Sequence, residues 1–467
     1  MRDQRIRDPL HDLVEFNASR SQLERVLWDV LQTRPFQRLR RIRQLGFSDL
    51  VYPGATHSRF LHSIGVFHTA RRLIKVVERY GNEDTKAQQA LAAALLHDVG
   101  HGPFSHAFEK IGERFGFKMA HHEDVSDHLI RHGEIADKLR DMGSGFANDV
   151  ADMVSGGGNS TIYSAIVSSQ FDADRLDYMR RDRLMAGSQH SGIDFEWLMQ
   201  NLEVGDVENS VDGTKLNPVR TFVLGQKAIL AAEAYVLGLF HLYPTVYFHK
   251  TTRGAENIYS ELLSRVIDLV KNGSIENTGL PKNHPLVKFS NNPEDIECVL
   301  SLDDTVIWGA LSLMAESKDE FISTFSKRLR DRNLYKCIDV RGRIAHDKSD
   351  ADSMSPECDA ACAYIRNELN DSVTNFSLSS PNSPPKILID DVERSPYKKL
   401  TEDSKGPLNQ INIRTEGGRL VDLSTRSHVV AALKKFRAFR VYYANGDEES
   451  KRKINEIISS GVSKWPT

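Results

Sequence analysis

The sequence predicts a mainly α-helical protein with a small C-terminal lobe of mixed helices and strands. Apolar residues recur at helical spacing through most of residues 1–335, whereas residues 336–467 contain short alternating runs typical of strands. A Ser/Pro-rich turn at 377–385 interrupts this second region. At 467 residues the chain exceeds one typical hydrophobic core, so we expect two domains that meet near residue 335.

The composition is that of an ordinary soluble protein. Hydrophobic residues make up 40% of the chain, charged residues 27%, and the net charge is −3. This charge argues against a general nucleic-acid binder, although it leaves room for a local basic groove. The N-terminus lacks the apolar run of a signal peptide, and no uninterrupted stretch of about 20 apolar residues is present. We therefore expect a cytoplasmic protein with no membrane partner.

The spacing and number of the four cysteines indicate neither a zinc ribbon nor a disulfide framework. Cys298, Cys337, Cys358 and Cys362 lack zinc-ribbon spacing and are too few to staple a fold of this length. Cys358 and Cys362 are spaced to share a helix face, but reduced thiols are the favoured interpretation.

Two helices with clear ends precede the most informative segment. The first begins after Ser58, which is a good N-terminal cap, and carries apolar residues at helical spacing as far as Gly81. The second is rich in Ala and Leu and begins near Asp84, which places His97 and Asp98 at its C-terminal end.

Three more helices are expected downstream. Pro103 suits the first turn of a helix that runs to about Phe115, and another helix begins near His122. A strong helix pattern starts at Asp172, with acids in its first turn and arginines later, as the helix dipole favours.

The rest of the chain alternates between helical and extended patterns. Residues 204–222 alternate in polarity and contain Asp212-Gly213, a strong hairpin signal. Helical segments then continue from Gln226 to about residue 332. Beyond them lie four β-like runs, KILID, INIR, GRLVDLS and FRVYYA, and two helix patterns, SHVVAALKKFR and EESKRKINEIISS.

The segment LLHDVGHGPFSH, at 95–106, carries most of the chemical information. His97 lies beside Asp98, and His101 and His106 follow within eight positions. An adjacent imidazole and carboxylate supply one nitrogen and one oxygen ligand, a mixture that suits a divalent ion of borderline hardness. Ionisable groups this close together in an apolar helical context are costly to bury without a charged partner. We interpret the segment as part of a site for a metal ion and a negatively charged substrate.

The ordered set His62, His97-Asp98 and Asp174 resembles the signature of the HD-domain metal-dependent phosphohydrolases. The flanking segments are similar to the branch that hydrolyses deoxynucleoside triphosphates (dNTPs), over about residues 5–330. The matching blocks are DPLHD at 8–12, PFQRLRRIRQLG at 35–46, YPGATHSRFLHSIGV at 52–66, LLHDVGHGPFSHAFE at 95–109, HHED at 121–124, DADRLDYMRRD at 172–182 and VYFHKTTR at 246–253. The resemblance implies that His62, His97, Asp98 and Asp174 together hold one divalent ion, which is Mg, Mn, Fe, Co, Ni or Zn.

The resemblance also implies roles for a catalytic group of residues. His122 is expected to act as the general acid, His101 and His106 to contact the phosphates, and Glu109 to orient a histidine. Relatives often have Asp at the position of Glu109.

Substrate contacts are implied for a further set: Arg59, Gln44, Leu45, Arg175, Tyr178, Asp182, His249 and Lys250. Arg59 is three residues from His62, nearly one helical turn, and is expected to grip phosphate. Tyr178 is expected to pack under the sugar, where its bulk disfavours a 2′-hydroxyl. His57, His68 and His128 are interpreted as packing or surface residues.

The implied reaction is hydrolysis of a dNTP to deoxynucleoside and triphosphate, with attack at the α-phosphorus. The resemblance further implies a homo-oligomer, a dimer or a tetramer, that a nucleotide effector activates. A phosphatase acting on nucleoside monophosphates or modified nucleotides stays open as an alternative, and so does a nucleotide-sensing defence protein. Nuclease activity or single-strand binding would require a basic groove.

Overall fold

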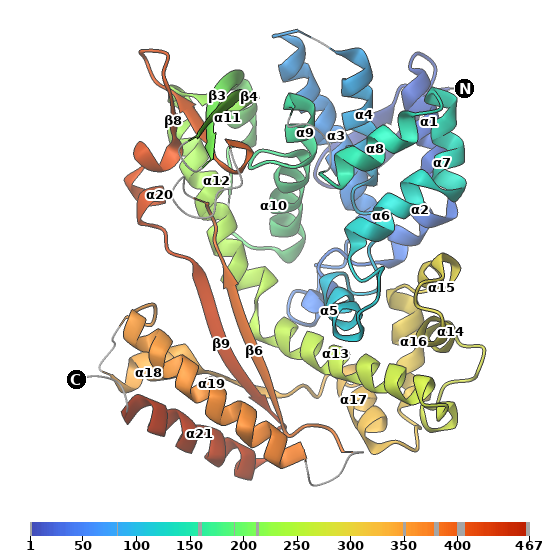
Figure 1. Cartoon of the computed structure of the whole chain (residues 1–467), viewed down its shortest axis with the longest axis vertical. Helices are drawn as coiled ribbons and strands as arrows, with labels where there is room; N and C mark the ends of the chain where they lie inside the picture. Colours follow the sequence, from blue (N-terminus) through green and yellow to red (C-terminus); the bar gives the residue numbers. More distant parts are fainter. Residues whose placement is uncertain are drawn as a thin grey trace. The chain divides into compact units, whose positions relative to one another are not determined.

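The structure is a computed structural model, and it describes residues 2–81, 83–156, 161–190, 192–211, 214–348, 352–377, 383–398 and 407–463. The chain is 59% helical and 13% strand, which confirms the predicted mainly α fold with a small sheet-containing C-terminal region. It forms two compact units (Figure 1). The first unit contains residues 1–243 and 395–434, and the second unit contains residues 244–394 and 435–467.

The first unit is built mostly of helices. Its helices are α1 (Gln22–Leu31), α2 (Arg34–Arg38), α3 (Arg59–Glu78), α4 (Asp84–Leu96), α5 (His106–Phe115), α6 (His122–Arg131), α7 (Gly133–Leu139), α8 (Phe146–Val154), α9 (Ile162–Val167), α10 (Ala173–Ala186), α11 (Phe195–Gln200), α12 (Ile229–Leu242) and α20 (His428–Ala432). Its strands are β1 (Gln4–Asp8), β2 (Asp12–Phe16), β3 (Leu202–Val211), β4 (Thr214–Gly225), β7 (Asn412–Arg414) and β8 (Leu420–Asp422).

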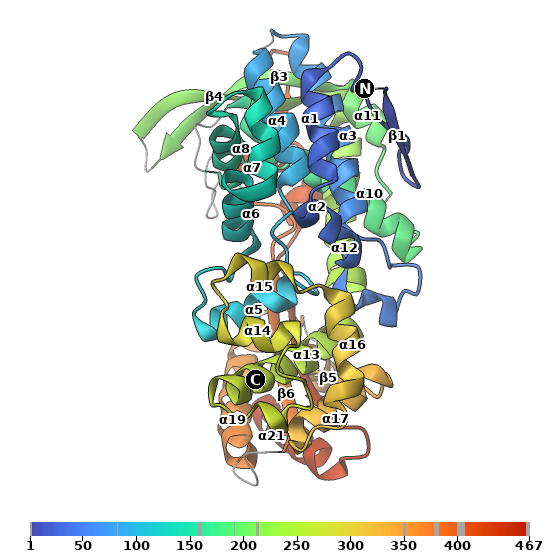
Figure 2. The ribbon, with the colours of Figure 1, turned by 90° about the vertical axis from the view of Figure 1, so that its right-hand side faces the viewer.

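Helix α3 is the central element of the first unit. It begins where the Ser58 hydroxyl accepts a hydrogen bond from the Leu61 amide, as the capping pattern predicted. It packs against both α4 and α10, so residues far apart in the sequence meet along its sides. Its buried face includes Ile64, Phe67 and Leu73. In Figure 2, α6, α7 and α8 are grouped beside α4 and the N-terminal helices.

Two small sheets complete the first unit. Strands β1 and β2 form an antiparallel hairpin. The second sheet has the order β3-β4-β7-β8, in which the long hairpin of β3 and β4 is extended by β7 running parallel to β4. The hairpin predicted for 204–222 is therefore present, while its predicted turn at Asp212-Gly213 lies outside the described residues.

The second unit combines helices with a three-stranded sheet. Its elements are α13 (Lys250–Lys271), α14 (Pro285–Asn291), α15 (Ile296–Leu300), α16 (Asp304–Met314), α17 (Glu320–Arg330), β5 (Lys336–Asp339), α18 (Val340–Asp347), α19 (Pro356–Ser377), β6 (Ile387–Arg394), β9 (Phe436–Tyr443) and α21 (Glu448–Ser463).

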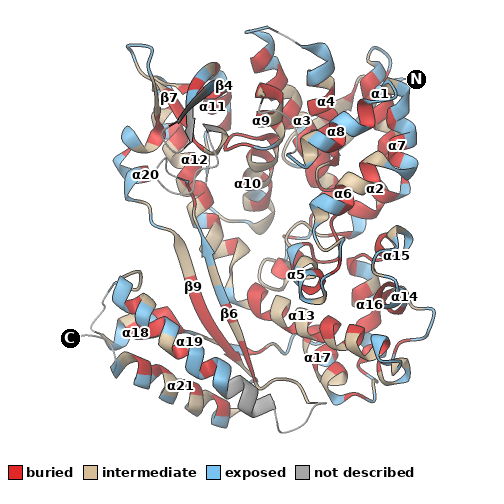
Figure 3. Cartoon of the chain, viewed as in Figure 1, coloured by how far each residue is buried: buried red, intermediate tan, exposed pale blue. Residues whose placement is uncertain are grey.

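An apolar core joins the sheet of the second unit to its helices. The sheet has the order β5-β9-β6, with both pairings antiparallel. Cys358 and Cys362 of α19 lie in this core with Ile387 of β6 and Phe439 of β9. Both cysteines are free thiols, consistent with the expected reduced state. Figure 3 shows buried and exposed patches alternating along α19, as expected for a helix that covers a sheet with one face.

The compact units do not divide at residue 335, where the sequence suggested a boundary between domains 1–335 and 336–467. The division instead falls after Tyr243, and residues 395–434 return to the first unit. The physical reason is that β7 pairs with β4, while the Gln170 amide donates a hydrogen bond to the Leu408 carbonyl at 3.0 Å. Part of the predicted Ser/Pro-rich turn, residues 378–382, lies outside the described residues.

Two predicted helices differ from the structure in their bounds. The helix expected to begin at Pro103 begins at His106, because Phe104 and Ser105 have φ values of 56° and 57°, which an α-helix does not accommodate. The pattern SHVVAALKKFR gives only the short helix α20, after which the chain enters β9.

One helical stretch among the described residues, Gln226–Tyr247, is long and apolar enough to cross a membrane by length and composition. Of its most apolar window, 44% is buried within the structure. A helix in the core of a soluble protein has the same properties.

Candidate metal centre

Three elements of the first unit bring four predicted metal ligands together. His62 lies in the first turns of α3, His97 and Asp98 directly follow α4, and Asp174 lies in the first turn of α10. Asp172 caps α10 by accepting a hydrogen bond from the Arg175 amide, which fixes the start of the helix and so the position of Asp174 in its first turn.

The donor atoms of these residues are spaced as ligands of a common ion would be. Asp174 Oδ1 lies 3.0 Å from His62 Nε2 and 3.6 Å from His97 Nε2. Asp98 Oδ1 lies 3.3 Å from His97 Nε2, and Asp98 Oδ2 lies 3.7 Å from His62 Nε2. Ligand atoms about 2.1 Å from one ion are roughly 3.0 to 3.4 Å apart in octahedral or tetrahedral geometry. These four distances are therefore equal to or slightly longer than those between ligands of a bound ion.

The pKa values of His62 and Asp174 are shifted because the two side chains lie close together. Burial lowers the pKa of His62, but hydrogen bonds to Asp174 and Asp177 outweigh it and raise the pKa to about 10. Burial raises the pKa of Asp174, yet its hydrogen bond to His62 and the nearby His97 imidazole hold that pKa well below its usual range. A proton between imidazole and carboxylate thus occupies the position that a cation would take.

The chemistry of the donor set fits a divalent ion. The buried His97 Nε2 has no hydrogen-bond partner among the described residues, although two carboxylates face it. The side chain of His62 is fully buried, whereas that of Asp174 is 34% exposed. The set is consequently closed at His62 and accessible at Asp174, as a site that admits substrate requires.

Sequence reasoning missed the residue that orients His62. Asp177, one turn after Asp174 on α10, accepts a hydrogen bond from His62 Nδ1 at 2.9 Å, which leaves Nε2 directed at Asp174. Asp177 also contacts His11 Nε2 at 2.7 Å and Arg181 Nε at 2.7 Å. These buried partners hold the pKa of Asp177 well below its usual range against the opposing effect of burial.

A further buried ion pair completes this arrangement. Arg181 Nη1 donates to Asp8 Oδ2 at 2.9 Å, which ties α10 to the end of β1. Both blocks, DPLHD and DADRLDYMRRD, were recognised in the sequence, but no role was assigned to His11, Asp177 or Arg181. The available signal was the spacing of three residues between Asp174 and Asp177, which places both on one helix face.

Because residue 65 of α3 is glycine, the Asp177–Arg181 pair of α10 can pack directly against α3. A Cβ atom at this position would lie 2.2 Å from Asp177 Oδ1 and 2.2 Å from Arg181 Nη2. Glycine within a helix is unfavourable relative to alanine by about 1 kcal/mol, so its place here follows from the close approach.

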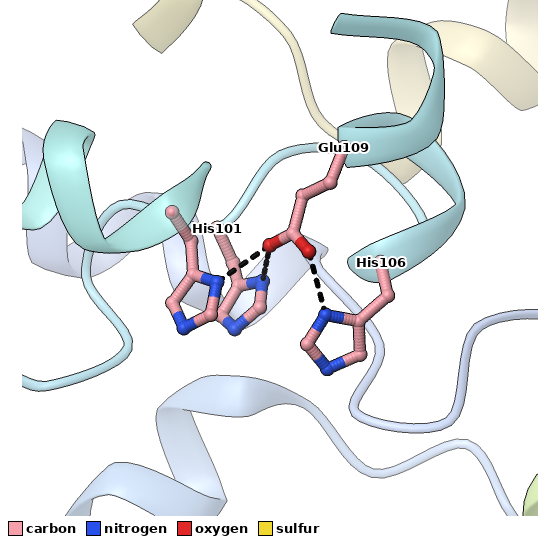
Figure 4. Close-up of side chains that lie close together, drawn as sticks. His101, His106 and Glu109 are labelled. Atoms are coloured by element: carbon pink, nitrogen blue, oxygen red, sulfur yellow. Dashed lines mark hydrogen bonds and ion pairs between the residues drawn. The ribbon is translucent and has the colours of Figure 1, made fainter. Parts of the chain in front are cut away.

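A second group of ionisable side chains adjoins the metal ligands. It comprises His101, His106, Glu109 and His122, all predicted as catalytic residues, and we call it the histidine cluster. Figure 4 shows Glu109 between His101 and His106, with its two carboxylate oxygens directed at different imidazoles. Glu109 Oε2 lies 2.8 Å from His106 Nδ1, and Oε1 lies 2.5 Å from His122 Nδ1.

Local backbone features position the histidine cluster. Gly100 lies so close to the start of α6 that a Cβ atom would be 2.3 Å from the carbonyl oxygen of His122. Phe104 and Ser105 both adopt positive φ, and the Phe104 ring stacks on Phe47 with centroids 4.1 Å apart. Non-glycine residues with positive φ cost about 1–3 kcal/mol each and are often found at functional sites.

The predicted phosphate ligand Arg59 lies against the metal ligands. Its Nη1 donates to Asp98 Oδ2, and its Nε donates to the Ser105 hydroxyl at 2.8 Å. Asp98 Oδ2 also lies 3.7 Å from His62 Nε2, and Asp98 Oδ1 lies 3.3 Å from His97 Nε2. Arg59 therefore neutralises part of the Asp98 charge, while both carboxylate oxygens face candidate ligands.

The remaining predicted substrate residues of the first unit lie on two segments. The Gln44 amide donates to the His57 carbonyl at 3.0 Å, which holds Gln44 and the half-buried Leu45 beside the start of α3. Gln44 Oε1 is buried and has no hydrogen-bond partner within the described ranges. Arg175 and Tyr178 are half-buried on α10.

Asp182, which was predicted to contact the substrate, has its side chain bound to another residue. Its Oδ1 lies 2.8 Å from His57 Nε2, and both side chains are buried. His57 thus contributes to packing, as interpreted from the sequence. The His68 ring lies tilted against that of His11, and the His128 ring against that of His132, with centroids 4.7 and 4.9 Å apart.

His249 and Lys250 belong to the second unit, and their proposed contact with substrate stays a prediction. His249 caps α13, where its Nδ1 accepts a hydrogen bond from the Thr251 amide at 3.2 Å. The Lys250 carbonyl accepts a hydrogen bond from the Tyr442 hydroxyl at 2.8 Å.

Comparison with known families agrees with this geometry. Residues 59–179 match the HD domain, a range that contains all four candidate metal ligands and the histidine cluster. Residues 194–282 match the HD associated region. The chain therefore contains an HD domain followed by an HD associated region. HD domains are metal-dependent, and the His and Asp groups described above are able to hold a metal ion.

Similar proteins cover most of the chain. YwfO of Bacillus subtilis, described as uncharacterized, is 28% identical over 97% of this chain and 96% of its own length. The deoxynucleoside triphosphate triphosphohydrolase SAMHD1 of Mus musculus is 27% identical over 71% of this chain and 53% of its own length, and a Dictyostelium discoideum homolog is 29% identical over 67% and 57%. A phosphohydrolase structure from Bacteroides thetaiotaomicron superimposes with a TM-score of 0.70 at 25% identity, covering 95% of this chain and all of that one.

Asp174→Asn is expected to remove bound metal while preserving the fold. Losing a residue that only supports a ligand weakens metal affinity about 10- to 100-fold, so losing a ligand should weaken it on the order of 100-fold or more. Metal content after dialysis and circular dichroism would measure both effects. The matched control is Asp141→Asn, at an exposed position. Full metal content in Asp174→Asn would contradict the ligand assignment.

Gly65→Ala is expected to destabilise the first unit by about 1–3 kcal/mol, because the added methyl group collides with Asp177 and Arg181. Denaturant unfolding would measure the loss, and metal affinity should fall as well because His62 loses its orientation. Gly417→Ala is the control, since no described atom lies within 4 Å of a Cβ atom there. Equal stability of the two variants would argue against the close approach.

Proposed function

We propose that this protein hydrolyses dNTPs to deoxynucleoside and triphosphate. The observation that carries the proposal is the adjacency of two groups within one HD domain. His62, His97 and Asp98, with Asp174 beside the two histidines, suit a divalent ion, and the histidine cluster next to them suits phosphate binding and proton transfer. Similarity to SAMHD1 proteins over about two thirds of the chain supports the choice of substrate.

A bound divalent ion would neutralise phosphate charge and lower the pKa of a water molecule that attacks phosphorus. Arg59 supplies a fixed positive charge beside Asp98, where it binds a phosphate oxygen. His101 is 1% exposed and its Nε2 lies 3.3 Å from Asp98 Oδ1, so its ring spans the distance between the metal ligands and Glu109.

Protonation of the leaving group is assigned to His122. In the reaction, the bond between the α-phosphorus and O5′ breaks, and O5′ takes up a proton. Glu109 binds Nδ1 of both His122 and His106, so the Nε2 atom of each ring remains to meet the substrate. Glu109 stays ionised in this arrangement: burial raises its pKa, but His106 and His122 hold it well below its usual range. A carboxylate at this position stabilises the protonated imidazole of the general acid.

Binding of the sugar is assigned to α10 and the segment that precedes α3. Tyr178 lies one turn beyond Asp174, and Gln44 presents a buried carbonyl oxygen with no hydrogen-bond partner among the described residues. Activation by a nucleotide effector and assembly into a dimer or tetramer belong to the same proposal. Assays with mixed nucleotides and mass measurement in solution would test both.

Inorganic triphosphate is the expected product when the purified protein is incubated with Mn²⁺ or Mg²⁺ and each dNTP, singly and in mixtures. Chromatography of the products would distinguish triphosphate from orthophosphate. Asp98→Ala should abolish both metal binding and turnover, because it removes a ligand and the partner of Arg59. Orthophosphate as the sole phosphate product would instead indicate a phosphatase and contradict the proposal.

Tyr178→Ala is expected to relax discrimination against ribonucleotides, because a smaller side chain leaves space for a 2′-hydroxyl. A steric penalty of about 1.4 kcal/mol corresponds to a tenfold change, so the ratio of kcat/KM for dNTP over NTP should fall by about tenfold or more. Tyr80→Ala, at a residue that is 43% exposed, provides the control. An unchanged ratio in Tyr178→Ala would remove this tyrosine from sugar selection.

A further inference from the structure

Ser105 occupies a backbone position that favours glycine. Its φ is 57° and its ψ is −125°. The Ala107 amide donates to the Phe104 carbonyl at 3.2 Å, so Phe104–Ala107 form a turn in which Ser105 is the first central residue. These angles are close to the mirror image of about −60° and +120°, the values of this position in a type II turn. A mirror-image turn of this kind normally has glycine here, because a Cβ atom makes the conformation strained.

Helix capping does not account for a serine at this strained position. Ser105 is the residue before α5, yet its hydroxyl makes no capping hydrogen bond to that helix. The Ser58 hydroxyl, in contrast, caps α3. Ser105 is 4% exposed, and its hydroxyl accepts a hydrogen bond from Arg59 Nε at 2.8 Å and donates one to the Arg43 carbonyl at 3.2 Å. The hydroxyl therefore serves contacts with residues distant in the sequence.

The contact with Arg59 fixes the guanidinium of the residue assigned to phosphate binding. Arg59 Nη1 donates to Asp98, and Nε donates to Ser105. A guanidinium is planar, so hydrogen bonds from two of its nitrogens set the direction of the third. These two bonds leave Nη2 to bind a phosphate oxygen. We propose that Ser105 is a positioning residue, whose hydroxyl is kept at a strained position because it aims Arg59 at the substrate phosphates.

This inference rests on the proposed function, which assigns phosphate binding to Arg59. The same hydroxyl also links other parts of the candidate site. The Arg43 carbonyl belongs to the segment that carries Gln44, to which sugar binding is assigned, and Ser105 directly precedes His106 of the histidine cluster. One buried side chain thus relates the phosphate-binding residue to both neighbouring parts of the site.

The strain is tested by comparing two variants that lack the same hydroxyl. Ser105→Ala keeps the Cβ atom and Ser105→Gly does not, so Ser105→Gly is expected to unfold at the higher denaturant concentration. The order should be reversed at Ser155, which is exposed and has a φ of −73°. At such an angle glycine brings no relief of strain and costs conformational entropy, so Ser155→Ala should be more stable than Ser155→Gly.

The positioning role is tested by the binding of inorganic triphosphate in the presence of Mn²⁺, measured by calorimetry. Ser105→Gly and Ser105→Ala are both expected to bind triphosphate about tenfold more weakly than wild type, because each loses the hydrogen bond that directs a charged group. Both Ser155 variants should keep the affinity of wild type. A merely structural role predicts instead that the loss of binding follows the loss of stability and is larger in Ser105→Ala. Metal content should be unchanged, because no candidate ligand is altered.

Undiminished triphosphate binding in Ser105→Gly would overturn the proposal. A loss of binding that follows stability would do the same, as would greater stability of Ser105→Ala than of Ser105→Gly, or a wild type that binds no triphosphate. Circular dichroism establishes folding, and a Ser105→Ala that fails to fold beside a folded Ser105→Gly is the expected order of stability, with Ser105→Gly then deciding the binding. Neither measurement requires turnover, so failure of wild type to release triphosphate from dNTPs would refute the proposed function while these results still decide the role of Ser105.

Discussion

One buried carboxylate organises the candidate metal centre. Asp177 accepts hydrogen bonds from His62 Nδ1 at 2.9 Å and from Arg181 Nε at 2.7 Å. Arg181 in turn donates a hydrogen bond to Asp8. Removing one partner from a fully buried ion pair leaves an uncompensated charge and typically costs about 3–5 kcal/mol. The positions of α3 and α10 are therefore coupled to the orientation of His62, and the same bonds that hold the helices together direct a ligand atom at the ion site.

Much of the fold could be predicted from local patterns because caps and apolar spacing are local properties. Ser58 and Asp172 begin α3 and α10 as expected, and the alternating runs FRVYYA and KILID lie in β9 and β6. The pairing of β7 with β4 was not predictable, since a parallel partner nearly 190 residues later leaves no local signal. The positive φ angles at Phe104 and Ser105 were missed for the same reason: tertiary contacts, not sequence preference, impose them.

The candidate site was predicted as far as residue identity allows. His62 and Asp174 are separated by 112 positions, so their proximity at 3.0 Å followed from a family resemblance and not from spacing. Asp177 and Arg181 were missed because DADRLDYMRRD is so rich in charge that it resembles a solvated helix face, whereas both side chains are fully buried. A charged residue in a helix can be recognised as buried only when the partners that neutralise its charge are known.

Each unit is built from two separate segments of the chain, and this affects how the protein folds during synthesis. Residues 395–434 complete the sheet of the first unit, and residues 435–467 supply β9 and α21 to the second. Since β9 is the central strand of its sheet, neither unit has all its strands until most of the polypeptide has left the ribosome. Domains usually fold in order as they emerge during translation. Here the β4 edge stays unpaired until residues 412–414, which form β7, have been synthesised.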